Sequence, residues 1–103
     1  MAKSIKSVTK KVIVTHPRTG TEREFDEAVY TRFKSAIVQS LKKSNGKTFT
    51  ELTDDVIEIF RKNKAGFKGS IPWYTISVLL DLQTRGITET FTENGKKLNR
   101  LSH

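Results

Sequence analysis

The clearest alternation of apolar and polar positions lies in the stretch after Gly69. Ser70 suits a helix N-cap, Pro72 suits a first helical turn, and Gly86 suits a left-handed helix end. We therefore predict a helix over residues 70–85. At about 100° per residue, its side chains divide into an apolar arc and a polar stripe. The arc comprises Trp73, Ile76, Val78, Leu79, Leu80 and Leu82, and the stripe comprises Tyr74, Ser77, Asp81, Thr84 and Arg85.

The two faces of this helix predict different environments. Trp73 shares its arc with Ile76 and Leu80, so we expect it to pack in the core rather than to meet a ligand. The polar stripe is expected to face water or a partner. Tyr74 lies on that stripe, where an aromatic ring is either a partner contact or a partly buried surface residue.

A β-hairpin is predicted directly after this helix. Residues 87–92 alternate apolar or β-branched with polar side chains, and Asn94-Gly95 is a strong two-residue hairpin turn. Residues 97–101 then return as the second strand. The inward contacts are expected to be Ile87, Phe91, Leu98 and Leu101.

The earlier part of the chain predicts a second hairpin and two more helices. Residues 11–15 and 21–25 read as strands joined by a turn that contains Pro17. Asp26 is a suitable N-cap for a first helix that ends near 44–46. The apolar positions of that helix are Val29, Phe33, Ala36, Ile37 and Leu41.

A short extended link over 47–49 leads to the other helix, for which Thr50 is the expected cap. Its apolar stripe comprises Leu52, Val56, Ile59 and Phe60. Residues 64–69 form a basic, glycine-containing connection to the helix over 70–85.

Composition favours one small α+β domain over 9–103. The chain has 103 residues, of which 35% are hydrophobic, enough for one modest core. Residues 1–8 are polar and basic, so we predict a disordered tail there. There is no apolar run of membrane-spanning length and no secretory leader, which makes the cytoplasm the expected location. The chain has no cysteine, which excludes disulfides and thiolate chemistry.

The formal net charge of +8 points to an anionic partner. Most of the excess lies before residue 48, and part of it is equally well explained as a solubilising tail.

The predicted order of elements resembles the winged-helix superfamily over residues 26–102. In that order a helix, a short strand and two further helices precede a two-stranded wing. The run from Val78 to Ile87, with Trp73 before it and Leu98 and Arg100 after it, is similar to a small, mainly bacterial single-domain family of unknown function. The superfamily resemblance implies double-stranded DNA binding, with the third helix in the major groove and the wing along the backbone or minor groove. The winged-helix superfamily also includes modules that bind only proteins.

If the chain binds DNA in this way, the polar stripe would read base edges. The candidate nucleic-acid-binding residues are Lys68, Ser70, Tyr74, Ser77, Arg85, Lys96 and Lys97. Arg85 can address guanine, and the lysines and the helix start can hold phosphates. Against this interpretation, Asp81 stands four residues before Arg85, so the two charges can neutralise each other.

A protein-interaction module is the alternative function. Tyr74, the wing and the strand edge at Val12–Val14 would then engage another chain or a second copy. A free strand edge invites a homodimer by strand addition, which would also suit a palindromic DNA site.

Enzymatic and metal-binding interpretations find little support in the sequence. Gly46-Lys47-Thr48 lacks the first glycine of a phosphate-binding loop. An exposed helix face explains Asp54, Asp55 and Glu58 more simply than a catalytic carboxylate pair does. His16 and His103 have no second ligand at metal-binding spacing. We therefore expect no enzymatic activity, no metal and no cofactor.

Overall fold

A computed structural model describes residues 11–16, 19–63, 67 and 69–102 of the chain. Three helices and two antiparallel two-stranded sheets confirm the predicted α+β class. The elements in chain order are β1 (Lys11–Thr15), β2 (Glu22–Asp26), α1 (Glu27–Leu41), α2 (Phe49–Lys62), α3 (Ile71–Thr84), β3 (Thr88–Glu93) and β4 (Lys96–Leu101). The tail predicted over 1–8 lies outside the described residues. Among the described helices, none is long and apolar enough to cross a membrane.

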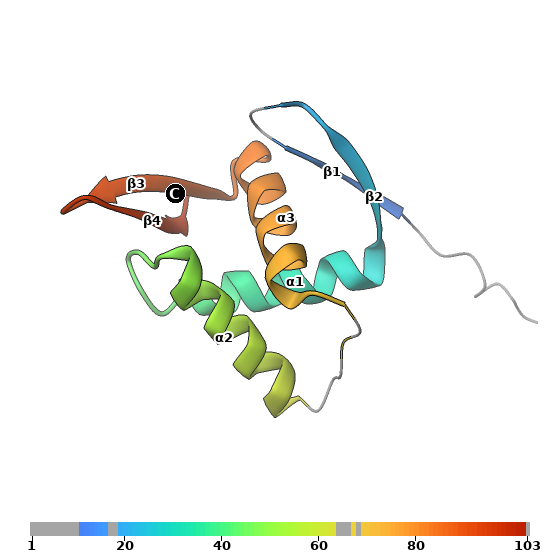
Figure 1. The fold of residues 1–103 in the computed structure, drawn as a ribbon, viewed down its shortest axis with the longest axis horizontal. Helices are drawn as coiled ribbons and strands as arrows, with labels where there is room; N and C mark the ends of the chain where they lie inside the picture. The colour runs from blue at the N-terminus through green and yellow to red at the C-terminus, as the bar shows by residue number, and fades with distance from the viewer. Residues whose placement is uncertain (1–10, 17–18, 64–66, 68, 103) are drawn as a thin grey trace, which may run out of the picture.

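The core lies where the three helices meet, with one hairpin on either side of α3 (Figure 1). Phe33, Ile37, Leu52, Val56 and Val78 are fully buried there. Leu79 and Leu82 of α3 complete this apolar centre. The helix periodicity therefore identified most of the core correctly.

Helix α2 begins earlier than its predicted cap at Thr50. The N-cap is Thr48, whose hydroxyl accepts from the Glu51 N–H at 3.2 Å while the Glu51 carboxylate accepts from the Thr48 N–H at 2.9 Å. Glutamate at the third helical position completes this reciprocal box, and Thr50 has no counterpart for it. The correction moves the start of the helix to Phe49.

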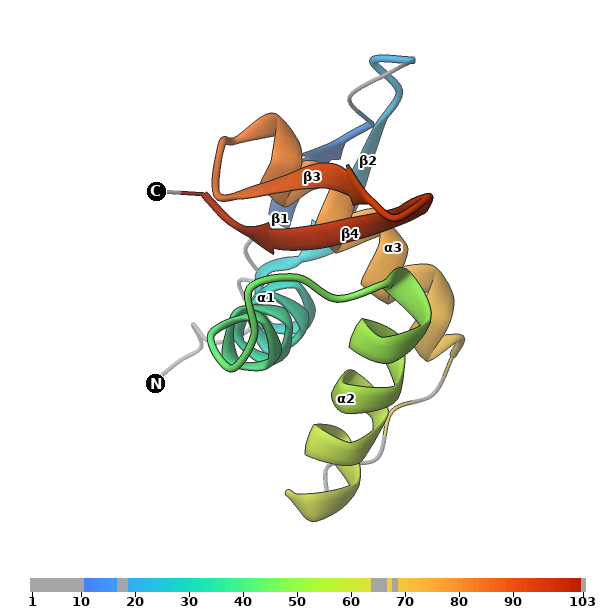
Figure 2. The ribbon, with the colours of Figure 1, turned by 90° about the vertical axis from the view of Figure 1, so that its left-hand side faces the viewer.

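The link before α2 connects the helices to the C-terminal hairpin. Lys47 forms an isolated antiparallel bridge with Asn99 of β4, with backbone bonds of 2.8 and 2.9 Å. The Lys47 ammonium also donates to Asp55 and to Ser40. The bond from Lys47, followed by the one from Ser40, lowers the pKa of Asp55. This short strand-like link was predicted, and in the structure it lies beneath β4 (Figure 2).

The C-terminal hairpin has the predicted turn. Asn94 and Gly95 have φ values of 53° and 80°, the left-handed pair that a type I′ turn requires. Ile87 and Leu101 pack against the core as expected. Phe91 and Leu98 point the other way and cover Gly46, where an added Cβ would lie 2.7 Å from the Phe91 ring. Side chains alternate between the two faces of a strand, so Phe91 and Leu98 lie on the face of the hairpin that Leu101 does not share. Their expected inward position was therefore wrong.

The N-terminal hairpin packs across α3 and α1. Val14 of β1 and Phe25 of β2 are both buried, and the strands pair from Lys11 opposite Asp26 to Thr15 opposite Glu22. Asp26 is the N-cap of α1, as predicted, but its side chain makes no cap bond and pairs with Lys11 instead. The hairpin is therefore part of the folded body.

Thr48→Ala is expected to lower the free energy of unfolding by about 1 kcal/mol, because it removes one half of the capping box. Thr50 is exposed in the first turn of the same helix, so Thr50→Ala provides a matched control that should change stability by less than about 0.5 kcal/mol. Urea unfolding followed by circular dichroism measures both. Equal losses in the two variants would contradict the assignment of the cap to Thr48.

Candidate functional site

The outward face of α3 differs from the predicted polar stripe. The helix starts with Ser70, whose hydroxyl accepts from the Trp73 N–H at 3.2 Å, and Gly86 follows it at φ 77°, so its predicted ends are confirmed. Its core side is formed by Thr75, Val78, Leu79, Asp81 and Leu82. Trp73 is 41% exposed, so its expected place in the core was wrong.

The reason lies in the width of the apolar arc. It covers more than half of the helix circumference, so the core can take Leu82 and leave Trp73 on the opposite side. The surplus apolar residues Trp73, Ile76 and Leu80 then face the N-terminal hairpin across a cleft.

Asp81, predicted to face outward, is a buried polar residue of α3 whose carboxylate accepts from three donors. Its side chain is 2% exposed. One carboxylate oxygen accepts from the Tyr30 hydroxyl and from Arg85 Nε, both at 2.6 Å, and the other accepts from the Thr15 N–H at 2.9 Å. A buried carboxylate is tolerated only with such partners. Burial and the bond to Asp81 raise the pKa of Tyr30, and the bond to Asp81 raises the pKa of Arg85.

The same end of α3 occupies the free edge of β1. Arg85 donates to the Ile13 carbonyl at 2.9 Å, and the Thr84 hydroxyl donates to the Thr15 carbonyl at 3.3 Å. Together with the bond from the Thr15 N–H to Asp81, these contacts satisfy outward-facing groups of the strand. The expectation that the edge at Val12–Val14 is open to another chain is therefore wrong for the Ile13 carbonyl.

The predicted base-reading residues do not form one open surface. Tyr74 lies in an aromatic cluster, 5.1 Å from Phe25 and 5.4 Å from Phe33 between ring centroids. Ser77 lines the cleft beneath the hairpin, and Arg85 is held by Asp81 and β1. The Ser70 hydroxyl caps the helix, and Lys68 lies outside the described residues. The prediction of a single outward stripe was wrong because the N-terminal hairpin covers part of it.

Lysines without a described ion pair lie at both ends of the other hairpin, and Lys42 lines a pocket with Glu89, Arg100 and Leu101 at its base. Lys96 and Lys97 are exposed at its tip, and Lys42 and Lys43 are exposed at the end of α1, in the loop that lies beneath β4 (Figure 2). None of these four makes an ion pair with any described residue. In contrast, two arginines do have ion-pair partners: Arg85 binds Asp81, and Arg100 binds Glu89. We call these four lysines the basic end.

The described body as a whole is only weakly basic. All eleven acidic residues but only thirteen of the nineteen basic residues lie in the described part, which leaves a net charge of about +2 there. The basic end also carries Glu93 beside Lys96. Its positive character therefore comes from unpaired lysines on a nearly balanced body.

Comparison with known proteins identifies a family. The model of a family of unknown function, DUF6958, matches residues 11–98. The chain belongs to the DUF6958 family. This agrees with the predicted resemblance to a family of unknown function, and it gives no support for the winged-helix superfamily. No curated protein and no solved structure matches the chain.

In this DUF6958 chain, sequence analysis identified one polar pair and missed the rest of its network. The spacing of Asp81 and Arg85 revealed their ion pair. Tyr30 and Thr15 lie far away in sequence, and no local pattern connects them to Asp81. Tyr30 could have indicated a buried polar contact, because the hydroxyl of a tyrosine whose ring is buried in α1 needs a hydrogen-bond partner.

Asp81→Ala is expected to destabilise the protein by about 2–4 kcal/mol, because it leaves the Tyr30 hydroxyl and the Thr15 N–H without an acceptor. Tyr30→Phe removes one donor only and should cost about 1 kcal/mol. Urea unfolding of both single variants and the double variant gives the coupling energy between the two side chains. Purely additive losses would contradict a shared network.

Proposed function

We propose that this chain is a non-enzymatic nucleic-acid-binding protein with winged-helix-like architecture, which holds the phosphate backbone with its basic end. The observation that carries the proposal is that two exposed lysine pairs flank the C-terminal hairpin without ion-pair partners among the described residues, Lys96 and Lys97 at its tip and Lys42 and Lys43 near its base. The order of elements supports it, because a short link bridges β4 as the first strand of a winged-helix sheet would. Double-stranded DNA is the proposed ligand.

The chemistry of these side chains suits phosphate contacts. Each lysine that neutralises a phosphate releases condensed counterions, which favours binding and makes it depend on salt. Four such contacts predict a slope of about −3.6 in a plot of log affinity against log salt concentration. Lysine is a point charge that carries no base specificity, so we expect modest discrimination between sequences.

The role proposed for α3 is smaller than in the sequence-based hypothesis. Arg85 is held by Asp81 and the Ile13 carbonyl, so its guanidinium would have to leave both to address a guanine. Asp81 would then be left buried without a cationic partner, which is costly. The proposal therefore rests on lysine contacts with the phosphate backbone of DNA, and it does not require α3 to read base edges.

A protein-interaction module is the second candidate function. The observation that favours it is the exposure of Trp73 and Ile13, each at 41%, on either side of the N-terminal hairpin. Large exposed apolar residues of this kind anchor many protein interfaces. A second copy of the chain is one such partner, and a homodimer would show as a doubled mass in light scattering. Binding through these residues should change little with salt, whereas phosphate binding should weaken steeply.

Replacing Lys96 and Lys97 by Ala together is expected to weaken binding to a labelled mixed-sequence duplex and to make the salt slope shallower by about 2. Fluorescence anisotropy at several salt concentrations measures both quantities. The unfolding free energy should be unchanged, because both side chains are exposed.

Lys34 and Lys62 provide a charge-matched control, since neither makes a described ion pair and both lie on helices away from the hairpin tip. Replacing both by Ala should leave most of the affinity intact. Equal loss in the two double variants would show that net charge alone drives binding. Absence of binding by the unaltered protein at low salt would refute the proposed function.

A further inference from the structure

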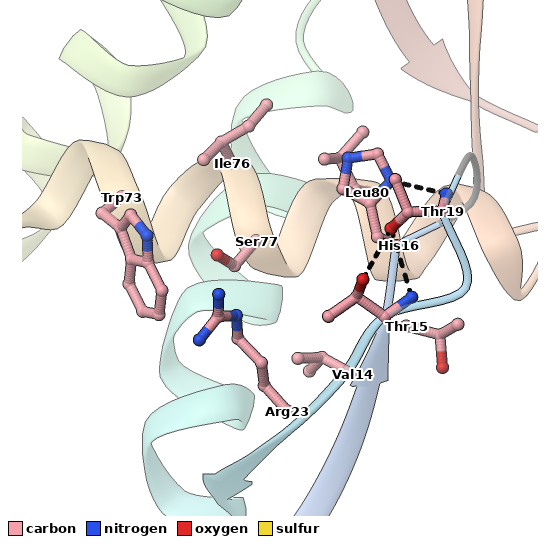
Figure 3. Close-up of a pocket in the computed structure, with 10 residues that line it drawn as sticks. Val14, Thr15, His16, Thr19, Arg23, Trp73, Ile76, Ser77 and Leu80 are labelled. Carbon is pink, nitrogen blue, oxygen red and sulfur yellow. Dashed lines mark hydrogen bonds between the residues drawn. The ribbon is translucent and has the colours of Figure 1, made fainter.

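A cleft separates the N-terminal hairpin from the outward face of α3 (Figure 3). It has a volume of about 330 Å³, at the lower end of the range typical of small-molecule sites. Trp73, Ile76, Ser77 and Leu80 contribute from the helix. The hairpin contributes Val14, Thr15, His16, Thr19, Thr21 and Arg23.

The helix side of this cleft is apolar and open to a ligand. Trp73, Ile76 and Leu80 follow one another along α3, and none of them is fully buried. The indole of Trp73 marks one end of the row and Leu80 marks the other (Figure 3). Covering these side chains would remove apolar surface from water, which supplies binding free energy for a hydrocarbon chain.

A cation lies against this apolar row. The guanidinium carbon of Arg23 is 5.6 Å from the centroid of the Trp73 ring, and the guanidinium points toward Ser77 (Figure 3). Arg23 makes no ion pair with any described residue, although all eleven acidic residues of the chain are described. Its neighbours Glu22 and Glu24 project from the opposite face of β2, because side chains alternate along a strand.

The rim of the cleft adds hydroxyl groups and the imidazole of His16. The hydroxyls of Ser77, Thr15 and Thr21 belong to lining residues, and no acidic residue lines the cleft. A planar guanidinium beside hydroxyls suits a carboxylate, which accepts two parallel hydrogen bonds from arginine. The apolar row beside Arg23 suits the remainder of such a ligand.

We propose that this cleft binds a small amphipathic carboxylate, with its carboxylate on Arg23 and its hydrocarbon chain along Trp73, Ile76 and Leu80. Arg23 lies beside the apolar row, as a ligand with a charged group at one end of a hydrocarbon chain requires. The site is separate from the basic end and does not depend on the proposed function.

Octanoate is the test ligand, and Trp73 is the reporter because it is the only tryptophan of the chain. Titration should give a saturable change in tryptophan fluorescence. 1-Octanol has the same chain without the charge and should bind at least about ten-fold more weakly, because it cannot form the charged hydrogen bonds to Arg23. Equal affinity for the two compounds, or no saturable change with octanoate, would overturn the proposal.

Arg23→Gln should lower the affinity for octanoate by about ten-fold and leave that for 1-octanol nearly unchanged. Arg61→Gln is the matched control, since Arg61 is exposed on α2 and lines no part of the cleft. Both substitutions lie on the surface, so the folded state should persist in each. Unchanged octanoate affinity in Arg23→Gln would contradict the site. A fluorescence change that depends on protein concentration instead of octanoate would assign the cleft to a second copy of the chain.

The octanoate titration contains no nucleic acid, so it tests the cleft independently of the proposed DNA binding. A failed octanoate titration leaves duplex binding by the basic end untouched. Conversely, duplex binding can fail while octanoate binds in the cleft.

Discussion

The buried carboxylate of Asp81 is the constraint on which the arrangement of this domain depends. A charge removed from water is tolerated only where hydrogen-bond donors surround it, and here the donors come from three elements. Tyr30 belongs to α1, Arg85 follows α3, and Thr15 ends β1. Helix α3, helix α1 and the N-terminal hairpin are therefore held together at one point.

This arrangement divides the surface into two regions with different chemistry. Along α3, the N-terminal hairpin leaves a cleft with an apolar row beside Arg23, a cation without an ion pair to any described residue. Elsewhere, the C-terminal hairpin and the α1–α2 loop present lysines to solvent. A small amphipathic anion suits the first region, and a polyanion suits the second. Both assignments follow from the cations that have no ion pair within the described part of the chain.

Local signals in the sequence predicted the elements well and the orientation of α3 poorly. Ser70, Gly86 and the Asn94-Gly95 turn act through their own backbone, so their effects are visible in a short stretch of sequence. The side of α3 that becomes buried depends on Tyr30 and Thr15, which are distant in sequence. A helix with apolar residues on more than half of its circumference can pack in several rotations, and long-range polar contacts choose among them. For the same reason, sequence patterns located the exposed lysines at the hairpin tip but gave no indication of the cleft.

Amide hydrogen exchange at Thr15, measured by NMR, tests most directly whether Asp81 holds the hairpin on α3. The Thr15 N–H points away from β2, so its described acceptor is the Asp81 carboxylate at 2.9 Å. We predict exchange as slow as that of core amides in the unaltered protein, and fast exchange in Asp81→Ala under conditions where the helices stay folded. Fast exchange of Thr15 in the unaltered protein would show that the hairpin is not held by this carboxylate.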